Sequence, residues 1–176
     1  MLFRSRHALP ETTPLTAHGE FVRAELKRDD EHATSRRPAW RAASILTKAQ
    51  VDTFLFVRLP ISPTVDFSRA ACLVLDTWVP EGQRTPNQLL VILHEKNGGD
   101  FLAATGRSLG GPGHERTFLP WARFQLAGWS KDGDGELDLQ RVDEVRIGWG
   151  GYFGSEGETI DFSVALPETG SHELSP

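Results

Sequence analysis

The chain has little cysteine and no long apolar run. Cys72 is the one cysteine among 176 residues, so no intrachain disulfide can form. Because it sits inside an apolar stretch, we expect it to be a small buried hydrophobe. No run of about 18 apolar residues could span a membrane, and residues 1–7 lack the apolar segment of a signal peptide. The sequence therefore excludes a disulfide scaffold and gives no membrane partner.

Basic residues and enzyme motifs are also scarce. Nineteen Lys and Arg against 24 Asp and Glu give a net charge of -5, and the two signs are interspersed. No basic stripe could follow a phosphate backbone, which excludes nucleic acid as a partner. The six histidines show no pair at metal-ligand spacing. A Gly-x-Ser-x-Gly elbow, a His-Glu-x-x-His helix and a phosphate-binding Gly-rich loop are all missing, so the motifs indicate no catalysis.

Turn residues between short apolar runs dominate what is present. Seventeen Gly and 11 Pro separate stretches rich in strand formers. This pattern predicts an all-β fold, a two-sheet antiparallel β-sandwich. The expected strands are residues 54–59, 72–79, 89–95, 101–105, 118–126, 145–149 and 160–166.

The ends of the chain show weaker patterns. We expect residues 1–18 to be a flexible segment, 19–167 to be the sandwich domain and 168–176 to be a tail. The charge cluster at 28–37 has no apolar face and is expected outside the core, whereas 21–26 fits either a strand or a helical turn. Residues 166–170 spell a sortase signal, which we interpret as a strand end followed by a proline stop.

Alternation along the strands assigns side chains to faces, because successive residues of a strand point to opposite sides of its sheet. In the run 72–79, Leu73, Leu75 and Val79 share one face, which leaves Asp76 and Trp78 on the other. In each of three later runs, the same alternation places one polar or charged residue on the face away from the apolar side chains. These residues are His94, Arg146 and Asp161. The sequence therefore predicts one sheet face that carries all of these side chains, together with Arg123.

Four segments and one tryptophan match a known family: Leu119-Pro-Trp-Ala-Arg-Phe124, Trp129, Asp132-Gly-Asp-Gly-Glu-Leu-Asp-Leu139, Val145-Arg-Ile-Gly148 and Ile160-Asp-Phe-Ser-Val164. Together they resemble carbohydrate-binding modules of the galactose-binding-like β-sandwich type, a jelly roll. The resemblance covers about residues 60–167. It implies a non-catalytic module that binds a polysaccharide or oligosaccharide beside a glycoside hydrolase or lyase, secreted or periplasmic. A protein-interaction module of the same fold and a small glycan-active enzyme remain alternatives.

Sugar recognition needs a flat apolar surface for the C–H face of a pyranose and fixed polar groups for its hydroxyls. Trp78 is the first candidate for that surface, and Trp129 and Tyr152 are the next. The polar candidates are Asp76, His94, Arg123 and Arg146. Trp121 and Trp149 are expected to be core aromatics.

Acidic residues suggest two places for a structural calcium, although no cofactor is required. Asp132, Asp134, Glu136 and Asp138 resemble the opening of a calcium loop. Leu137, however, stands where an EF-hand needs glycine, and a turn that leads into a short helix at 137–142 is the other interpretation. By resemblance to the sandwich modules, Asp161 is the second place.

Overall fold

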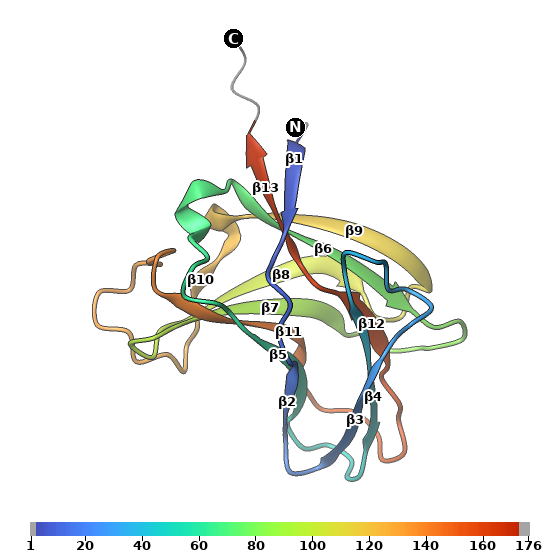
Figure 1. Ribbon diagram of the computed structural model, residues 1–176. Coiled ribbons are helices and arrows are strands. Elements are labelled where there is room, and N and C mark those ends of the chain that lie inside the picture. Colours follow the sequence, from blue (N-terminus) through green and yellow to red (C-terminus); the bar gives the residue numbers. More distant parts are fainter. Residues whose placement is uncertain (1–2, 173–176) are drawn as a thin grey trace.

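The computed structural model describes residues 3–172, which form two antiparallel sheets packed face to face (Figure 1). Sheet B has six strands in the order β10-β8-β7-β11-β5-β2. Their bounds are β10 Gln125–Leu126, β8 Asp100–Ser108, β7 Gln88–Glu95, β11 Val142–Tyr152, β5 Thr53–Pro60 and β2 Leu15–His18.

Sheet A has seven strands in the order β1-β13-β6-β12-β4-β3, with β9 on the other edge of β6. Their bounds are β1 Phe3–Ala8, β13 Glu168–His172, β6 Cys72–Val79, β12 Phe162–Ala165, β4 Ala39–Leu46, β3 Val22–Arg28 and β9 Gly113–Pro120. Two short 3-10 helices, η1 Phe67–Arg69 and η2 Trp121–Arg123, complete the regular structure of residues 3–172. None of these helices is long and apolar enough to cross a membrane.

Sheet A divides along one edge of β6. The first half of this strand pairs with β13, where Cys72 lies opposite Gly170, and the second half pairs with β12, where Trp78 lies opposite Ser163. As a result β1 and β13 run together away from β12, β4 and β3, as Figure 1 shows. The division leaves a gap in the backbone ladder that side chains must fill.

The core lies between the sheets and follows the alternation of the strands. Leu73, Leu75, Val145, Ile147 and Trp149 have no exposed surface. Trp149 is therefore a core aromatic, as the sequence indicates. Trp121 is half-buried, packs edge-on against Phe67 and donates from its indole nitrogen to the Ala70 carbonyl at 2.7 Å.

The all-β sandwich is confirmed, and most of the expected strands are present. The run 72–79 is β6 in full, and the runs at 54–59, 89–95, 101–105 and 145–149 lie inside longer strands. The expected strand at 118–126 is wrong in its bounds, because β9 ends at Pro120 and a 3-10 turn follows. The helical turn considered for 137–142 is reduced to a single hydrogen-bonded turn, in which the Arg141 N–H donates to the Asp138 carbonyl at 2.9 Å.

Segments expected outside the sandwich belong to it. Residues 3–8 and 168–172 pair with each other as β1 and β13, and residues 15–18 are edge strand β2 of sheet B. The interval 21–26, left open between strand and helical turn, is strand β3. Residues 29–38 form the loop from β3 to β4, and Arg37 of this loop reaches the gap in sheet A.

Candidate ligand-binding groove

The predicted site residues are divided between two outer faces. Asp76 and Trp78 project from β6 on the outside of sheet A, whereas His94 and Arg146 project from β7 and β11 on the outside of sheet B. The prediction of one shared face is therefore wrong. Alternation shows which residues of a strand point away from the core, but it does not show to which sheet the strand belongs.

A groove with a cavity volume of about 610 Å³ crosses the outer face of sheet B. Its lining comes from β8, β7, β11, β5 and β2, so it runs across the strands over four strand spacings, about 19 Å. Leu90, Ile92 and Leu102 supply the apolar lining from β7 and β8, and Phe54 and Phe56 supply it from β5. A groove of this length and direction fits an extended chain molecule.

Gly150 and Gly151 of β11 line the groove, and Gly148 precedes them on the same strand. Gly148 lies opposite Phe56 on β5 and Leu90 on β7. A Cβ atom at this position would lie 1.9 Å from the Leu55 carbonyl oxygen, so the backbone approach there requires glycine. A Cβ atom at Gly150 would lie 3.1 Å from the Phe54 Cβ. The bare backbone of β11 thus leaves room for the two phenylalanine rings beside it.

Charged side chains of alternating sign cross the same face. Arg58 donates to Glu144 at 2.9 and 2.7 Å, and Arg146 donates to the same carboxylate. Arg146 also donates to Asp100 at 3.2 Å, which completes a line from β5 across β11 to β8. Each of the two guanidinium groups is therefore paired with a carboxylate, so neither Arg58 nor Arg146 is an unpaired cation on this face.

The Glu144 carboxyl shows how closely this line is coupled. Burial raises the pKa of Glu144, but the hydrogen bonds from Arg58 and Arg146 outweigh burial and hold it below its usual value. The pKa of Arg58 is raised in return by its hydrogen bond to Glu144. The carboxylate stays ionised at neutral pH, which fixes both guanidinium groups in place.

Trp129 stands at one end of the groove with 58% of its surface exposed. Its indole nitrogen donates to Asp100 Oδ2 at 2.8 Å, and Asp100 Oδ1 also lies 2.6 Å from His94 Nδ1. The backbone N–H of Asp100 is bonded to the Ser130 hydroxyl at 2.9 Å. An exposed indole is therefore held in one orientation by a carboxylate that is itself fixed. Three of the predicted site residues, His94, Trp129 and Arg146, meet at Asp100.

Sequence reasoning missed Asp100 and the two phenylalanines of the groove. Asp100 opens β8 next to a Gly-Gly turn, where an acidic residue reads as a turn residue. Phe54 and Phe56 alternate with Leu55 and Val57 in a run that is apolar on both sides. Such a run resembles a fully buried strand, and only the sheet assignment shows that one side of it faces outward.

On the opposite face of the molecule, two histidine rings pack against the Trp78 indole. The His32 ring is stacked with its centroid at 4.5 Å, and the His114 ring lies at 4.9 Å. His32 is bonded to Asp29 at 2.8 Å. A second pocket of about 600 Å³ opens beside Trp78, under the β3–β4 loop. Trp78 thus lines this pocket with an indole that His32 and His114 already contact, whereas a sugar platform needs a free ring face.

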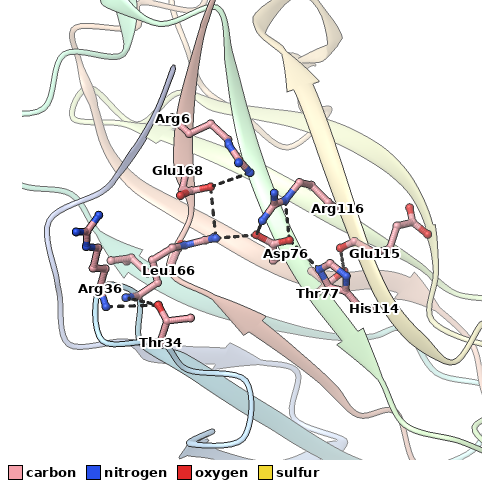
Figure 2. Close-up of polar contacts among 11 residues, drawn as sticks. Arg6, Thr34, Arg36, Asp76, Thr77, His114, Glu115, Arg116, Leu166 and Glu168 are labelled. Carbon is pink, nitrogen blue, oxygen red and sulfur yellow. Dashed lines mark hydrogen bonds and ion pairs between the residues drawn. The ribbon is translucent and has the colours of Figure 1, made fainter. Parts of the chain in front are cut away.

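Asp76 is buried among cations at the gap in sheet A (Figure 2). Its carboxylate accepts from Arg116 at 2.8 and 2.7 Å, from Arg37 at 2.7 Å and from His114 at 2.8 Å. Arg37 also donates to the Leu166 carbonyl, at the corner between β12 and β13. Burial raises the pKa of Asp76, but the bonds from Arg116, Arg37 and His114 hold it far below the usual range. These contacts give Asp76 a structural role.

The two remaining candidates lie apart from the groove. Arg123 is exposed in η2. Tyr152, at the end of β11, is half-buried and donates its hydroxyl to Glu158 at 2.8 Å. Burial and this acidic neighbour raise its pKa. Neither residue lines the groove of sheet B.

Four of the five carboxylates proposed for calcium, all but Glu136, have other partners. Asp132 accepts from the Gly135 N–H at 2.8 Å, Asp134 from the Glu136 N–H at 3.0 Å, and Asp138 from the Gln140 N–H at 2.9 Å. Asp161 pairs with Arg41 at 2.8 Å. In the part of the chain that the structure describes, no three histidine, cysteine or acidic side chains are grouped to hold a metal ion. Calcium binding stays a prediction.

Thermal melting tests whether calcium binds at either place. Because four of these five carboxylates already bond to backbone N–H groups or to Arg41, we expect millimolar CaCl₂ to leave the melting temperature where EGTA leaves it. A calcium-dependent rise that disappears in the Asp132→Asn, Asp134→Asn double variant would place the ion in the loop. A rise that disappears only in Asp161→Asn would place it beside β12.

Comparison with known proteins shows the fold. No protein-family model and no curated protein matches the chain. A family 11 carbohydrate-binding module from a cellulosomal cellulase of Clostridium thermocellum superposes with a TM-score of 0.68 at 12% identity, over 98% of this chain and 97% of that one. The family 11 module from the same organism in complex with a β-1,3-1,4-mixed-linked tetrasaccharide gives 0.69 at 13% identity, over 96% and 97% of the two chains. The chain therefore has the jelly-roll β-sandwich fold of these modules along nearly its whole length.

Proposed function

We propose that this protein is a non-catalytic carbohydrate-binding module and that the groove on the outer face of sheet B holds a neutral polysaccharide. The observation that carries the proposal is Trp129, an exposed indole that Asp100 fixes at the end of a groove across the strands. A fixed aromatic face binds the C–H side of a pyranose without the entropic cost of ordering a mobile side chain. The fold shared with a module that binds a mixed-linked tetrasaccharide supports the same assignment.

The charges of the groove favour a neutral ligand. Arg58 and Arg146 are paired with Glu144 and Asp100, and Asp52 adds a further carboxylate to the lining. A polyuronate would bring negative charge to a surface with no unpaired cation among these residues. Hydroxyl groups, in contrast, can bond to the outer lone pairs and N–H groups of such an ion-pair line.

The same groups argue against glycoside cleavage. The two catalytic carboxyl groups of a glycoside hydrolase include a general acid that keeps its proton near neutral pH, which requires a raised pKa. The pKa of Glu144 is lowered, and Asp100 is bonded to Arg146, His94 and Trp129. Glu144 therefore does not have the environment of a general acid, and Asp100 is occupied by three side-chain donors.

Affinity electrophoresis through gels that contain polysaccharide tests the proposal. Mixed-linked β-1,3-1,4-glucan and glucomannan are the neutral probes, and polygalacturonate and alginate are the acidic ones. We expect retardation by at least one neutral polymer and none by the acidic polymers, at an ionic strength near physiological. Retardation by the polyuronates alone would contradict the proposed charge selection.

A protein-interaction module of the same fold is the second candidate, because Leu90, Ile92 and Leu102 would also accept apolar side chains. A glycan array separates the two functions. If no glycan on the array binds and the gels show no retardation, the carbohydrate assignment fails and the protein-binding function is favoured.

A further inference from the structure

The groove of sheet B has two unlike edges, and the strand register defines them. Glu144 of β11 lies level with His94 of β7, which lies level with Asp100 of β8. Two residues further along β11, Arg146 lies level with Ile92, and Ile92 lies level with Leu102. One edge of the groove therefore carries the charged lining residues Arg146 and Asp100, beside Ile92 and Leu102.

The other edge is apolar. Two residues beyond Arg146, Gly148 lies between Leu90 and Phe56, and Gly150 lies against Phe54. The side chains at this edge are hydrocarbon, and only Asp52 brings a polar side chain to the lining near Phe54. Phe54 is 36% exposed and Leu90 is half-buried, so both can meet a ligand.

A pyranose that lies flat in this groove presents opposite ring edges to unlike surfaces. Hydroxyls along one edge meet Arg146 and Asp100 and can form hydrogen bonds. Hydroxyls along the opposite edge that point at Phe56 and Leu90 would lose water and gain no partner from these side chains, and only those beside Phe54 come near Asp52. A methyl or acetyl group at that edge would instead bury its carbon surface.

We infer that the ligand of this groove is a neutral glycan that carries apolar substituents along one edge, such as O-acetyl groups, methyl ethers or deoxy carbons. This inference rests on the proposed function and specifies its ligand class. Each methyl group that enters the apolar edge contributes about a fourfold gain in affinity. Unsubstituted chains of the same backbone bind in the same groove more weakly.

The test is calorimetric titration with a matched pair of ligands. A partially O-acetylated cello-oligosaccharide is divided into two portions, and one portion is deacetylated with mild base. We expect the acetylated portion to bind at least about fourfold more tightly, which corresponds to one buried methyl group. Equal affinity, or tighter binding of the deacetylated portion, would overturn the inference and leave the proposed function intact.

Substitutions in the groove test whether the apolar edge causes the preference for the acetylated ligand. Leu90→Gln keeps the side-chain length and places an amide on the apolar edge, so we expect the preference for the acetylated ligand to fall to near one. Leu15→Gln is the matched control, because Leu15 is half-exposed on β2 of the same sheet but does not line the groove. If both portions bind wild type but the preference persists in Leu90→Gln, the apolar edge is not its source. If neither portion binds and no gel shows retardation, the proposed function fails together with the inference.

Discussion

Asp76→Ala is expected to lower the free energy of unfolding by about 3 kcal/mol, the low end of the range for removing one partner of a buried ion pair. The low end applies because Arg116 and His114 are partly exposed and can regain water. Arg37 cannot do so easily, because its side chain is 12% exposed and is bonded to Leu166. Urea unfolding followed by tryptophan fluorescence measures the loss.

The control is Glu25→Ala on β3 of the same sheet. Glu25 pairs with Lys27 at 2.8 Å, but both side chains are more than half exposed, so the expected loss is within about 0.5 kcal/mol. A loss for Asp76→Ala no larger than this would show that the cluster does not hold the gap in sheet A. It would also reopen a ligand role for Asp76.

The pH dependence of this loss follows from the pKa of Asp76. The folded-state pKa is held below that of the unfolded chain, so the carboxylate contributes stability above the unfolded pKa of about 3.9. That contribution is lost as the pH falls below this value toward the folded pKa. The difference in unfolding free energy between wild type and Asp76→Asn should therefore shrink below about pH 4. A difference that grew in acid would contradict this sign.

The strands that could be predicted from the sequence are those whose own residues alternate regularly between apolar and polar. Regular alternation between turn residues was enough to find β6 in full and the central parts of β5, β7, β8 and β11. Strand β4 was missed because Ala42, Ala43 and Ser44 weaken its alternation, and β1 and β13 were missed because their residues are mostly polar. Tertiary pairing, which no local pattern encodes, makes these segments strands.

The site was predicted in part for the same reason. His94, Trp129 and Arg146 were recognised as outward polar and aromatic side chains, and they meet at Asp100. Asp76 and Trp78 have the same local pattern but lie on the other sheet, where Arg37, His32 and His114 surround them. The alternation within a strand identifies polar and aromatic side chains that point away from the core. Only the pairing of the strands shows which of them line the groove of sheet B and which belong to the ion cluster around Asp76.

Trp129→Ala is expected to weaken polysaccharide binding by at least about thirtyfold, the loss of about 2 kcal/mol that marks an aromatic hot spot. The melting temperature should change little, because 58% of the side chain is exposed and its loss opens no core cavity. Trp129→Phe keeps an apolar ring but loses the N–H bond to Asp100, so its affinity should fall between those of Trp129→Ala and wild type. Isothermal titration and thermal melting measure the two effects.

Two further variants make this result specific to the groove. Phe153→Ala removes an aromatic of nearly equal exposure that does not line the groove, so its affinity should match wild type. Trp78→Ala removes the candidate on the outer face of sheet A; it should lose stability, because two histidine rings pack against the indole, and it should retain affinity while folded. If Trp78→Ala abolishes binding while Trp129→Ala retains it, the ligand lies beside Trp78 in the pocket under the β3–β4 loop. In that outcome the charged line of sheet B would hold the strands together without contacting sugar.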